Sequence, residues 1–223
     1  METTLVIALS AEFALGVEHA FEPDHVVAVS TIASRSNIIS RSLVTGWLWG
    51  LGHTVSLLIA GILVLLLRVQ FPLSISGYFE LVVGVMLILL GVWTIIRLRR
   101  EKFHFHVHTH AGRTHAHLHS HAEGASHDHA HVPFFVGIVH GLAGSGALVV
   151  LTMSTMANAI DGVLFIASFG IGLILAMSLI ASTLSVPSIL GGRYSSLIRP
   201  VFSTCAGLLS ITLGVFTISA FLT

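Results

Sequence analysis

The first apolar segment of the chain contains the polar stretch Gly16-Val17-Glu18-His19-Ala20-Phe21-Glu22-Pro23-Asp24-His25. Apolar residues precede it at 5–9 and follow it at 26–29, so two histidines and three carboxylates lie where a membrane span is expected. An ionised side chain near the centre of a spanning helix costs about 3 kcal/mol on insertion scales, and residues of this kind mark functional sites. Imidazole and carboxylate groups bind mid-row divalent metal ions. The stretch therefore predicts a metal site at membrane depth.

Pro23 explains how this stretch can gather its ligands. On a continuous helix, side chains five or six positions apart point away from each other, because neighbours on one face are three or four apart. Proline lacks an N–H, and its ring clashes with the carbonyl four residues back, here that of His19. We expect a break between residues 19 and 23, with Asp24 in the first turn of a second half-helix, where negative charge is favoured. Broken helices with an ion at the break recur in membrane transporters.

Composition is typical of a polytopic membrane protein and excludes several other classes. The chain has 223 residues, of which 54% are hydrophobic and 9% charged, and its mean hydropathy is +0.94. No phosphate-cradling glycine loop and no basic nucleic-acid patch appears, so we expect no enzyme, no prosthetic group and no nucleic-acid partner. Cys205 is the single cysteine, which excludes an intrachain disulfide.

Six apolar segments are long enough to cross a membrane, at 4–33, 42–67, 75–97, 134–157, 162–184 and 200–221. The first exceeds the ~20 residues that a span needs, as expected for a helix that is broken near Pro23. The sequence thus predicts an all-α polytopic membrane protein with six transmembrane helices.

Three sequence matches in the same order indicate an internal repeat. Gly16-Val17-Glu18-His19 parallels Gly137-Ile138-Val139-His140, and Trp49-Gly50-Leu51-Gly52 parallels Phe169-Gly170-Ile171-Gly172. Gly84 with Gly91-Val92-Trp93-Thr94-Ile95 parallels Gly207 with Gly214-Val215-Phe216-Thr217-Ile218, so that the offsets are 121, 120 and 123 residues. Each half holds three spans, an odd number, which inverts one half relative to the other; such repeats bind substrate at their interface. We predict inverted three-helix repeats at 1–100 and 133–223, joined by a loop at 101–132.

Basic residues predict the orientation, because cytoplasmic loops carry an excess of lysine and arginine. Nine of the ten follow segments one, three and five: Arg35, Arg41, Arg97, Arg99, Arg100, Lys102, Arg113, Arg193 and Arg199. Only Arg68 falls on the other side. We therefore expect a multi-pass protein of the cell membrane, with both termini outside and the middle loop in the cytoplasm.

Two further histidines, His53 and His140, lie within predicted spans. Gly46 and Gly50 share the face of His53, and Gly137 shares that of His140, which opens the fourth span. Small residues let neighbouring helices approach closely, so both imidazoles should point into the bundle. Each is interpreted either as a metal ligand or as a buried histidine that hydrogen-bonds between helices; the ligand interpretation is favoured, since ionisable residues at this depth mark functional sites.

The remaining carboxylates of the first segment are open to more than one interpretation. Glu12 lies seven residues before His19 and so on its face, where it either lines an outer entrance or sits on the surface. Glu18 and Glu22 are undecided, although one of them can orient an imidazole from outside the ligand set.

The loop from His104 to His131 holds eleven of the fifteen histidines, mostly as His-X-His runs. Its composition predicts a segment without regular structure in the absence of metal. Imidazole-rich tracts bind nickel, copper, zinc and cobalt. The loop is therefore interpreted as a cytoplasmic metal sink, delivery arm or sensor; the alternative is a soluble spacer that has no part in transport.

The motifs His19-X4-Asp24-His25, Gly50-Leu51-Gly52-His53 and His140-Gly141 resemble those of the nickel/cobalt permease superfamily, most closely its six-span UreH-like branch. The resemblance covers nearly the whole chain apart from the histidine-rich loop. It implies a carrier of Ni2+ or Co2+, mostly inward, with His19, Asp24 and His25 as the ion site and His53 assisting. A related branch with histidine-rich loops exports these ions. The chain departs from the eight-span uptake permeases in its six spans and in Pro23.

Together these observations predict transport of a divalent metal ion, with Ni2+ or Co2+ as the substrate. The metal site is predicted to consist of His19, Asp24, His25, His53 and His140. Besides the ion and the lipid bilayer, the expected partners are a cytoplasmic metallochaperone or nickel-enzyme maturation proteins. Export is the first alternative. Two others belong to different classes: a membrane metal buffer that moves nothing, and a thiol–disulfide electron carrier, against which the single cysteine argues.

Overall fold

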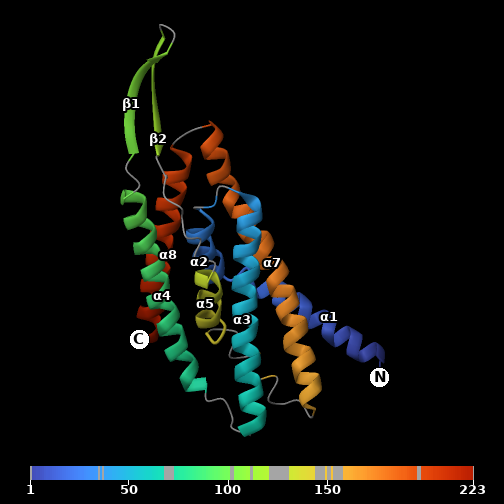
Figure 1. Cartoon of the computed structure of the whole chain (residues 1–223). Helices are drawn as coiled ribbons and strands as arrows, with labels where there is room; N and C mark the ends of the chain where they lie inside the picture. Colours follow the sequence, from blue (N-terminus) through green and yellow to red (C-terminus); the bar gives the residue numbers. More distant parts are fainter. Residues whose placement is uncertain are drawn as a thin grey trace.

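A computed structural model describes residues 2–34, 36, 38–67, 73–100, 103–110, 113–120, 131–143, 149, 152, 158–194 and 197–222. These residues form seven helices and one antiparallel pair of strands (Figure 1). In chain order the elements are α1 (Glu2–His19), α2 (Pro23–Ala33), α3 (Ile39–Leu67), α4 (Leu73–Arg100), β1 (Phe103–His110), β2 (Arg113–Ser120), α5 (His131–His140), α7 (Ala159–Tyr194) and α8 (Ile198–Leu222).

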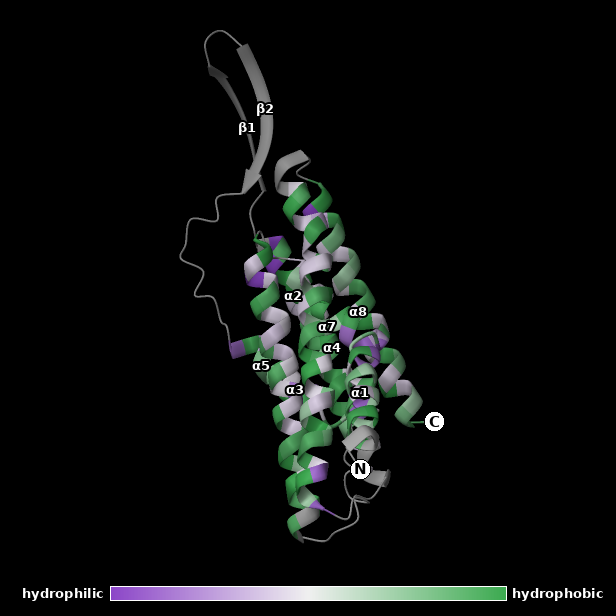
Figure 2. Ribbon diagram, turned by 90° about the vertical axis from the view of Figure 1, so that its right-hand side faces the viewer, coloured by the Kyte–Doolittle hydropathy of each residue, from purple (hydrophilic) through white to green (hydrophobic). Residues whose placement is uncertain are grey.

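Four of the described helices are long and apolar enough to cross a membrane: Ile39–Val64 of α3, Gly77–Arg99 of α4, Ala159–Gly191 of α7 and Ile198–Leu222 of α8. They correspond to the second, third, fifth and sixth predicted segments. Apolar residues extend along the bundle (Figure 2), and many are exposed, among them Leu89 at 62% and Phe216 at 66%. Extended apolar surface of this kind is expected for a protein that contacts lipid.

The long helices pack in two pairs, α3 against α7 and α4 against α8, while α1 packs on α7 and α5 packs on α3. Glycines permit the close approaches, because an added Cβ would overlap the neighbouring backbone. Gly16 of α1 lies against the Phe169 carbonyl of α7, and Gly137 of α5 lies against the Trp49 carbonyl of α3. The short helix α2 contacts α3, α4, α7 and α8, and both α2 and α5 lie in the middle of the molecule (Figure 1).

The first apolar segment is broken where Pro23 predicts the break. α1 ends at His19, and α2 begins at Pro23 with Asp24 in its first turn. The His19 carbonyl cannot accept a hydrogen bond from proline; it accepts one from the backbone N–H of Glu22 instead, over 3.0 Å. The prediction of a broken first helix is confirmed, and the break turns the ends of α1 and α2 toward each other.

The fourth predicted segment differs from expectation. α5 is an apolar helix of ten residues that ends at His140, whereas the sequence predicts that His140 opens a continuous span. Gly141 follows in a turn, where an added Cβ would lie 2.7 Å from the His53 carbonyl oxygen. Glycine is a poor helix former, so a helix that meets this glycine-rich run ends easily. The prediction for this segment is wrong at its start; residues 144–157 lie outside the described part, apart from 149 and 152.

The histidine-rich loop also differs from expectation. Residues 103–110 and 113–120, predicted to lack regular structure, form the antiparallel strands β1 and β2. The backbone register pairs His104 with His119, His106 with His117 and His108 with His115. Histidine alternates with Phe, Val, Thr or Leu at many of these positions, and a period of two with such residues favours a strand. Residues 121–130 lie outside the described part of the chain.

Candidate metal centre

Four helices bring the predicted site residues together. His19 is the last residue of α1, Asp24 and His25 lie in the first turn of α2, His53 lies within α3, and His140 is the last residue of α5. The four histidines are buried, with at most 4% of any of them exposed, and the Asp24 side chain is 28% exposed. The break between α1 and α2 allows His19 and His25 to meet, with ring centroids 4.5 Å apart.

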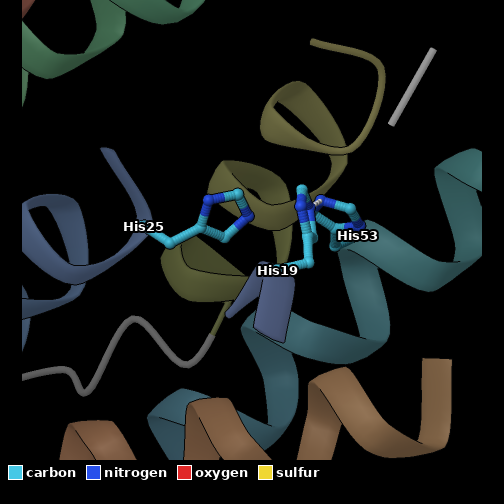
Figure 3. Close-up of side chains that lie close together, drawn as sticks. All are labelled: His19, His25 and His53. Carbon is cyan, nitrogen blue, oxygen red and sulfur yellow. Dashed lines mark hydrogen bonds between the residues drawn. The ribbon is translucent and has the colours of Figure 1, made fainter. Parts of the chain in front are cut away.

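The five residues form two overlapping groups. His19, His25 and His53 constitute the three-histidine group, and Asp24, His25 and His140 constitute the aspartate group. Within each group the candidate ligand atoms lie within 4.8 Å of one another. The rings of the three-histidine group lie close together, with His19 next to both His25 and His53 (Figure 3), and the His25 and His140 centroids are 4.2 Å apart. The sequence predicts these residues as one site; the structure divides them, with His25 in both groups.

Carboxylates fix the orientation of three imidazoles. Nδ1–H of His25 and Nε2–H of His140 donate to the two oxygens of Asp24, over 3.0 and 2.8 Å. Oε1 of Glu22 lies 3.0 Å from Nδ1 of His19. Since an ionised carboxylate only accepts hydrogen bonds, each of these three nitrogens carries the proton of its neutral ring. His19 then accepts, through Nε2, a hydrogen bond from Nε2–H of His53 over 2.9 Å.

This assignment of protons leaves lone pairs on three buried nitrogens. Nε2 of His25, Nδ1 of His53 and Nδ1 of His140 have no hydrogen-bond partner among the described residues. An unpartnered buried polar group costs about 1–3 kcal/mol, and the lone pair of a neutral imidazole is what binds a metal ion. Nitrogen ligands about 2.1 Å from an ion lie roughly 3–4 Å from one another. Side-chain shifts of about 1 Å would therefore close either group around an ion.

Two buried aromatic residues enclose the cluster. The Phe169 ring centroid lies 5.4 Å from that of His19, and the Trp49 centroid lies 6.4 Å from His25 and 5.7 Å from His140. Apolar surroundings lower the local dielectric and so strengthen the attraction between a cation and Asp24. The sequence matches Trp49 with Phe169 in the repeat but gives no reason to assign either residue to the site; that match was the only available signal.

Glu22 is the carboxylate that orients an imidazole, through its contact with His19. Glu12 is half-buried and Glu18 is exposed on α1, and neither belongs to a ligand group found in the described residues. Oε2 of Glu12 is buried and has no partner in that part of the chain. The side chains of the histidine-rich loop before His131 lie outside the description.

Comparison with known proteins agrees with a multi-pass membrane protein. The family model described as the cytochrome c biogenesis protein transmembrane region matches residues 25–216. The urease accessory protein UreH of Bacillus sp. (strain TB-90) is 36% identical over 218 residues, which cover 96% of this chain and 91% of that protein. No solved structure matches the chain at a significant level. The chain therefore belongs to the cytochrome c biogenesis transmembrane family and is a UreH-like multi-pass membrane protein.

Proposed function

We propose that this protein carries a divalent transition-metal ion across the membrane and that the buried cluster is where the ion passes. The observation that carries the proposal is the set of three buried imidazole nitrogens, on His25, His53 and His140, that have no hydrogen-bond partner in the described part of the chain. Buried polar groups with a purely structural role are normally hydrogen-bonded. Here Asp24 holds one nitrogen of His25 and one of His140 and leaves the other nitrogen of each ring available, as carboxylates do for metal-binding histidines in general.

Ni2+ is the proposed substrate, with Co2+ as the second choice. Imidazole and carboxylate suit nickel, cobalt and zinc alike, so the ligand types do not choose among them. The name of the relative connects that protein with urease, a nickel enzyme. Supply of nickel to a cytoplasmic enzyme requires inward movement, and the partners of the released ion would be a metallochaperone or nickel-enzyme maturation proteins.

The glycine contacts support an inverted repeat of residues 1–100 and 133–223. If each residue of a contact is replaced by the residue that matches it in the other half, the result is another contact that the structure contains. The contacts between α1 and α7 and between α3 and α5 are Gly16 with Phe169, Gly137 with Trp49, Gly172 with Phe13, and Gly52 with Phe134. Between α4 and α8, the contact of Gly91 with Gly207 corresponds in the same way to the contact of Gly214 with Gly84. Rocking of one repeat against the other would open the cluster to each side in turn.

The histidine-rich loop would receive the ion in the cytoplasm. Nine of ten basic residues flank that side, which favours both termini outside and the loop inside the cell. Three histidine pairs lie opposite one another in the register of β1 and β2, which supports a role in binding metal. The loop collects ions in this proposal, and transport through the bundle does not depend on it.

Uptake of radioactive nickel by cells that express the protein tests the proposal. We expect His19→Ala to reduce the initial rate to that of cells without the protein, because His19 is a ligand of the three-histidine group. His131→Ala is the matched control: it changes an exposed histidine at the other end of α5 and should leave the rate unchanged. Equal uptake by the wild type and by both His19→Ala and Asp24→Ala, at equal protein levels in the membrane, would refute the proposal.

Export is the second candidate, and the histidine-rich loop favours it, because such a loop could equally collect surplus metal for removal. Loss of an exporter makes cells more sensitive to nickel, whereas loss of an importer makes them accumulate less. A membrane metal buffer would bind nickel and give no flux in reconstituted vesicles. The family description raises the thiol–disulfide carrier again, but its chemistry needs two cysteines and the sequence has Cys205 alone.

A further inference from the structure

We propose that the ion occupies two subsites in turn, the three-histidine group and the aspartate group, and that His25 is the shared ligand that restricts the pair to one ion at a time. The inference rests on the proposed transport function and adds the path of the ion within the cluster. Its basis is the division of five residues into two triads with one member in common.

The two nitrogens of His25 face different triads. Nδ1 bonds to Oδ1 of Asp24 over 3.0 Å, and the other oxygen of Asp24 accepts from His140 over 2.8 Å. Nε2 is buried without a hydrogen-bond partner among the described residues. The ring extends from α2 toward His19 and His53, which lie beside each other (Figure 3), so Nε2 is the atom that it offers to the three-histidine group.

The chemistry of a neutral imidazole makes the two subsites exclusive. The ring has one proton and one lone pair, so it binds metal through one nitrogen at a time. With the ion in the three-histidine group, Nε2 of His25 is the ligand and Nδ1–H donates to Asp24. With the ion in the aspartate group, Nδ1 is the ligand and the proton resides on Nε2. Transfer of the ion thus moves one proton from Nδ1 to Nε2 of the same ring, and the protein gains and loses none.

The two subsites differ in charge, which gives the transfer a direction of preference. The three-histidine group consists of neutral ligands, whereas Asp24 offsets one unit of the ion's charge in apolar surroundings. The aspartate group is therefore the tighter of the two. Each subsite has only three protein ligands, fewer than the four to six that mid-row ions take in closed sites, and an ion in transit must be bound weakly enough to leave.

The number of Co2+ or Ni2+ ions bound per full-length chain tests the inference, with visible absorption of Co2+ reporting the ligands. The ten loop histidines from His104 to His129 are replaced by glutamine in every sample, so that only the cluster is counted. His53→Ala removes the three-histidine group and His140→Ala removes the aspartate group, while His25→Ala and the double variant His53→Ala/His140→Ala remove both. Gel-filtration profile and thermal unfolding establish that each variant is folded, and glutamine replaces alanine where one is not.

We expect one ion per chain in the parent. His53→Ala and His140→Ala should each bind one ion, with different Co2+ spectra. His25→Ala and the double variant should bind none. Both single variants should lose at least tenfold in nickel flux although they still bind. Two ions in the parent would overturn the exclusion. One ion retained by the double variant would overturn the two subsites, because neither group is complete in that variant; the proposed function would stand, with all five residues forming a single site. Unchanged binding by His25→Ala would overturn both this inference and the proposed function. Asp161→Asn, at an exposed residue in the first turn of α7, serves as the control and should match the parent.

Discussion

Asp24→Asn is the substitution whose effect follows most directly from the geometry. Asp24 accepts hydrogen bonds from Nδ1–H of His25 on Oδ1 and from Nε2–H of His140 on Oδ2, and Oδ1 also accepts one from the backbone N–H of His25. Asparagine is nearly the same size, so the packing of α2 is preserved, but it has only one oxygen that accepts. Its amide group would direct N–H toward one of the two imidazole N–H groups, and the negative charge would be lost.

The magnitude can be worked from these contacts. A hydrogen bond to a charged group contributes about 1.5–3 kcal/mol, and Asp24 is mostly buried, so solvent screens it little. Loss of one such bond, with 1.4 kcal/mol per factor of ten, corresponds to binding of Ni2+ that is weaker by about 10- to 150-fold. Loss of the charge acts in the same direction, because the aspartate group then contains only neutral ligands.

Isothermal titration of Ni2+ into the full-length chain in lipid nanodiscs, with the ten loop histidines replaced, measures this change. Asp161→Asn is the matched control, since Asp161 also lies in the first turn of a helix, α7, but is exposed. Its dissociation constant should equal that of the parent. A dissociation constant for Asp24→Asn within threefold of the control would refute the reasoning, because it would mean that neither the charge nor the hydrogen bonds of Asp24 act on the ion.

Two further predictions test the packing and the position of the aromatic wall. Gly16→Ala and Gly137→Ala should destabilise the protein by similar amounts, about 1–3 kcal/mol, because each added methyl group overlaps a backbone carbonyl at equivalent places in the proposed repeat; thermal unfolding in detergent should show a smaller effect for Gly77→Ala, which meets only the ring of Phe221. In the variant Trp47→Phe/Trp93→Phe, Trp49 is the only tryptophan left, and its ring centroid lies 6.4 Å from that of His25. Ni2+ should therefore quench its fluorescence when the cluster is intact and should not do so after His25→Ala. Quenching that survives His25→Ala would place the ion elsewhere.

The part of the site that could be predicted from the sequence depends on local physics. Pro23 lacks an N–H, which breaks the helix wherever the rest of the chain goes, and this alone brings His19 and His25 within reach of each other. The inward direction of His53 follows from the glycines on its face, and the structure buries His53 completely. Neither argument needs knowledge of a neighbouring helix.

The division into two groups could not be predicted, because it depends on contacts between helices that are far apart in sequence. Which imidazole meets Asp24 is set by how α5 lies on α3, and that approach is fixed by Gly137 against the Trp49 carbonyl. The end of α5 at His140 had a signal in Gly141, yet glycine is common within membrane helices, so the signal was ambiguous. The strands β1 and β2 are indicated by the alternation of histidine with apolar residues, but a prediction made from the composition of the loop does not use this alternation.

The ends of two helices add a field that favours a cation at the cluster. α1 ends at His19 and α5 ends at His140, so both helices direct their C-termini toward the same place. The C-terminus of a helix carries the equivalent of roughly half a negative charge, and the N-terminus of α2, which begins at Pro23, carries the opposite, so the three ends together contribute roughly half a negative charge. The cluster would therefore continue to attract a cation after Asp24→Asn, whereas the removal of His25 takes a ligand from both groups and leaves an attractive field without a site. This contrast is why Asp24→Asn is expected to weaken nickel binding and His25→Ala to abolish it.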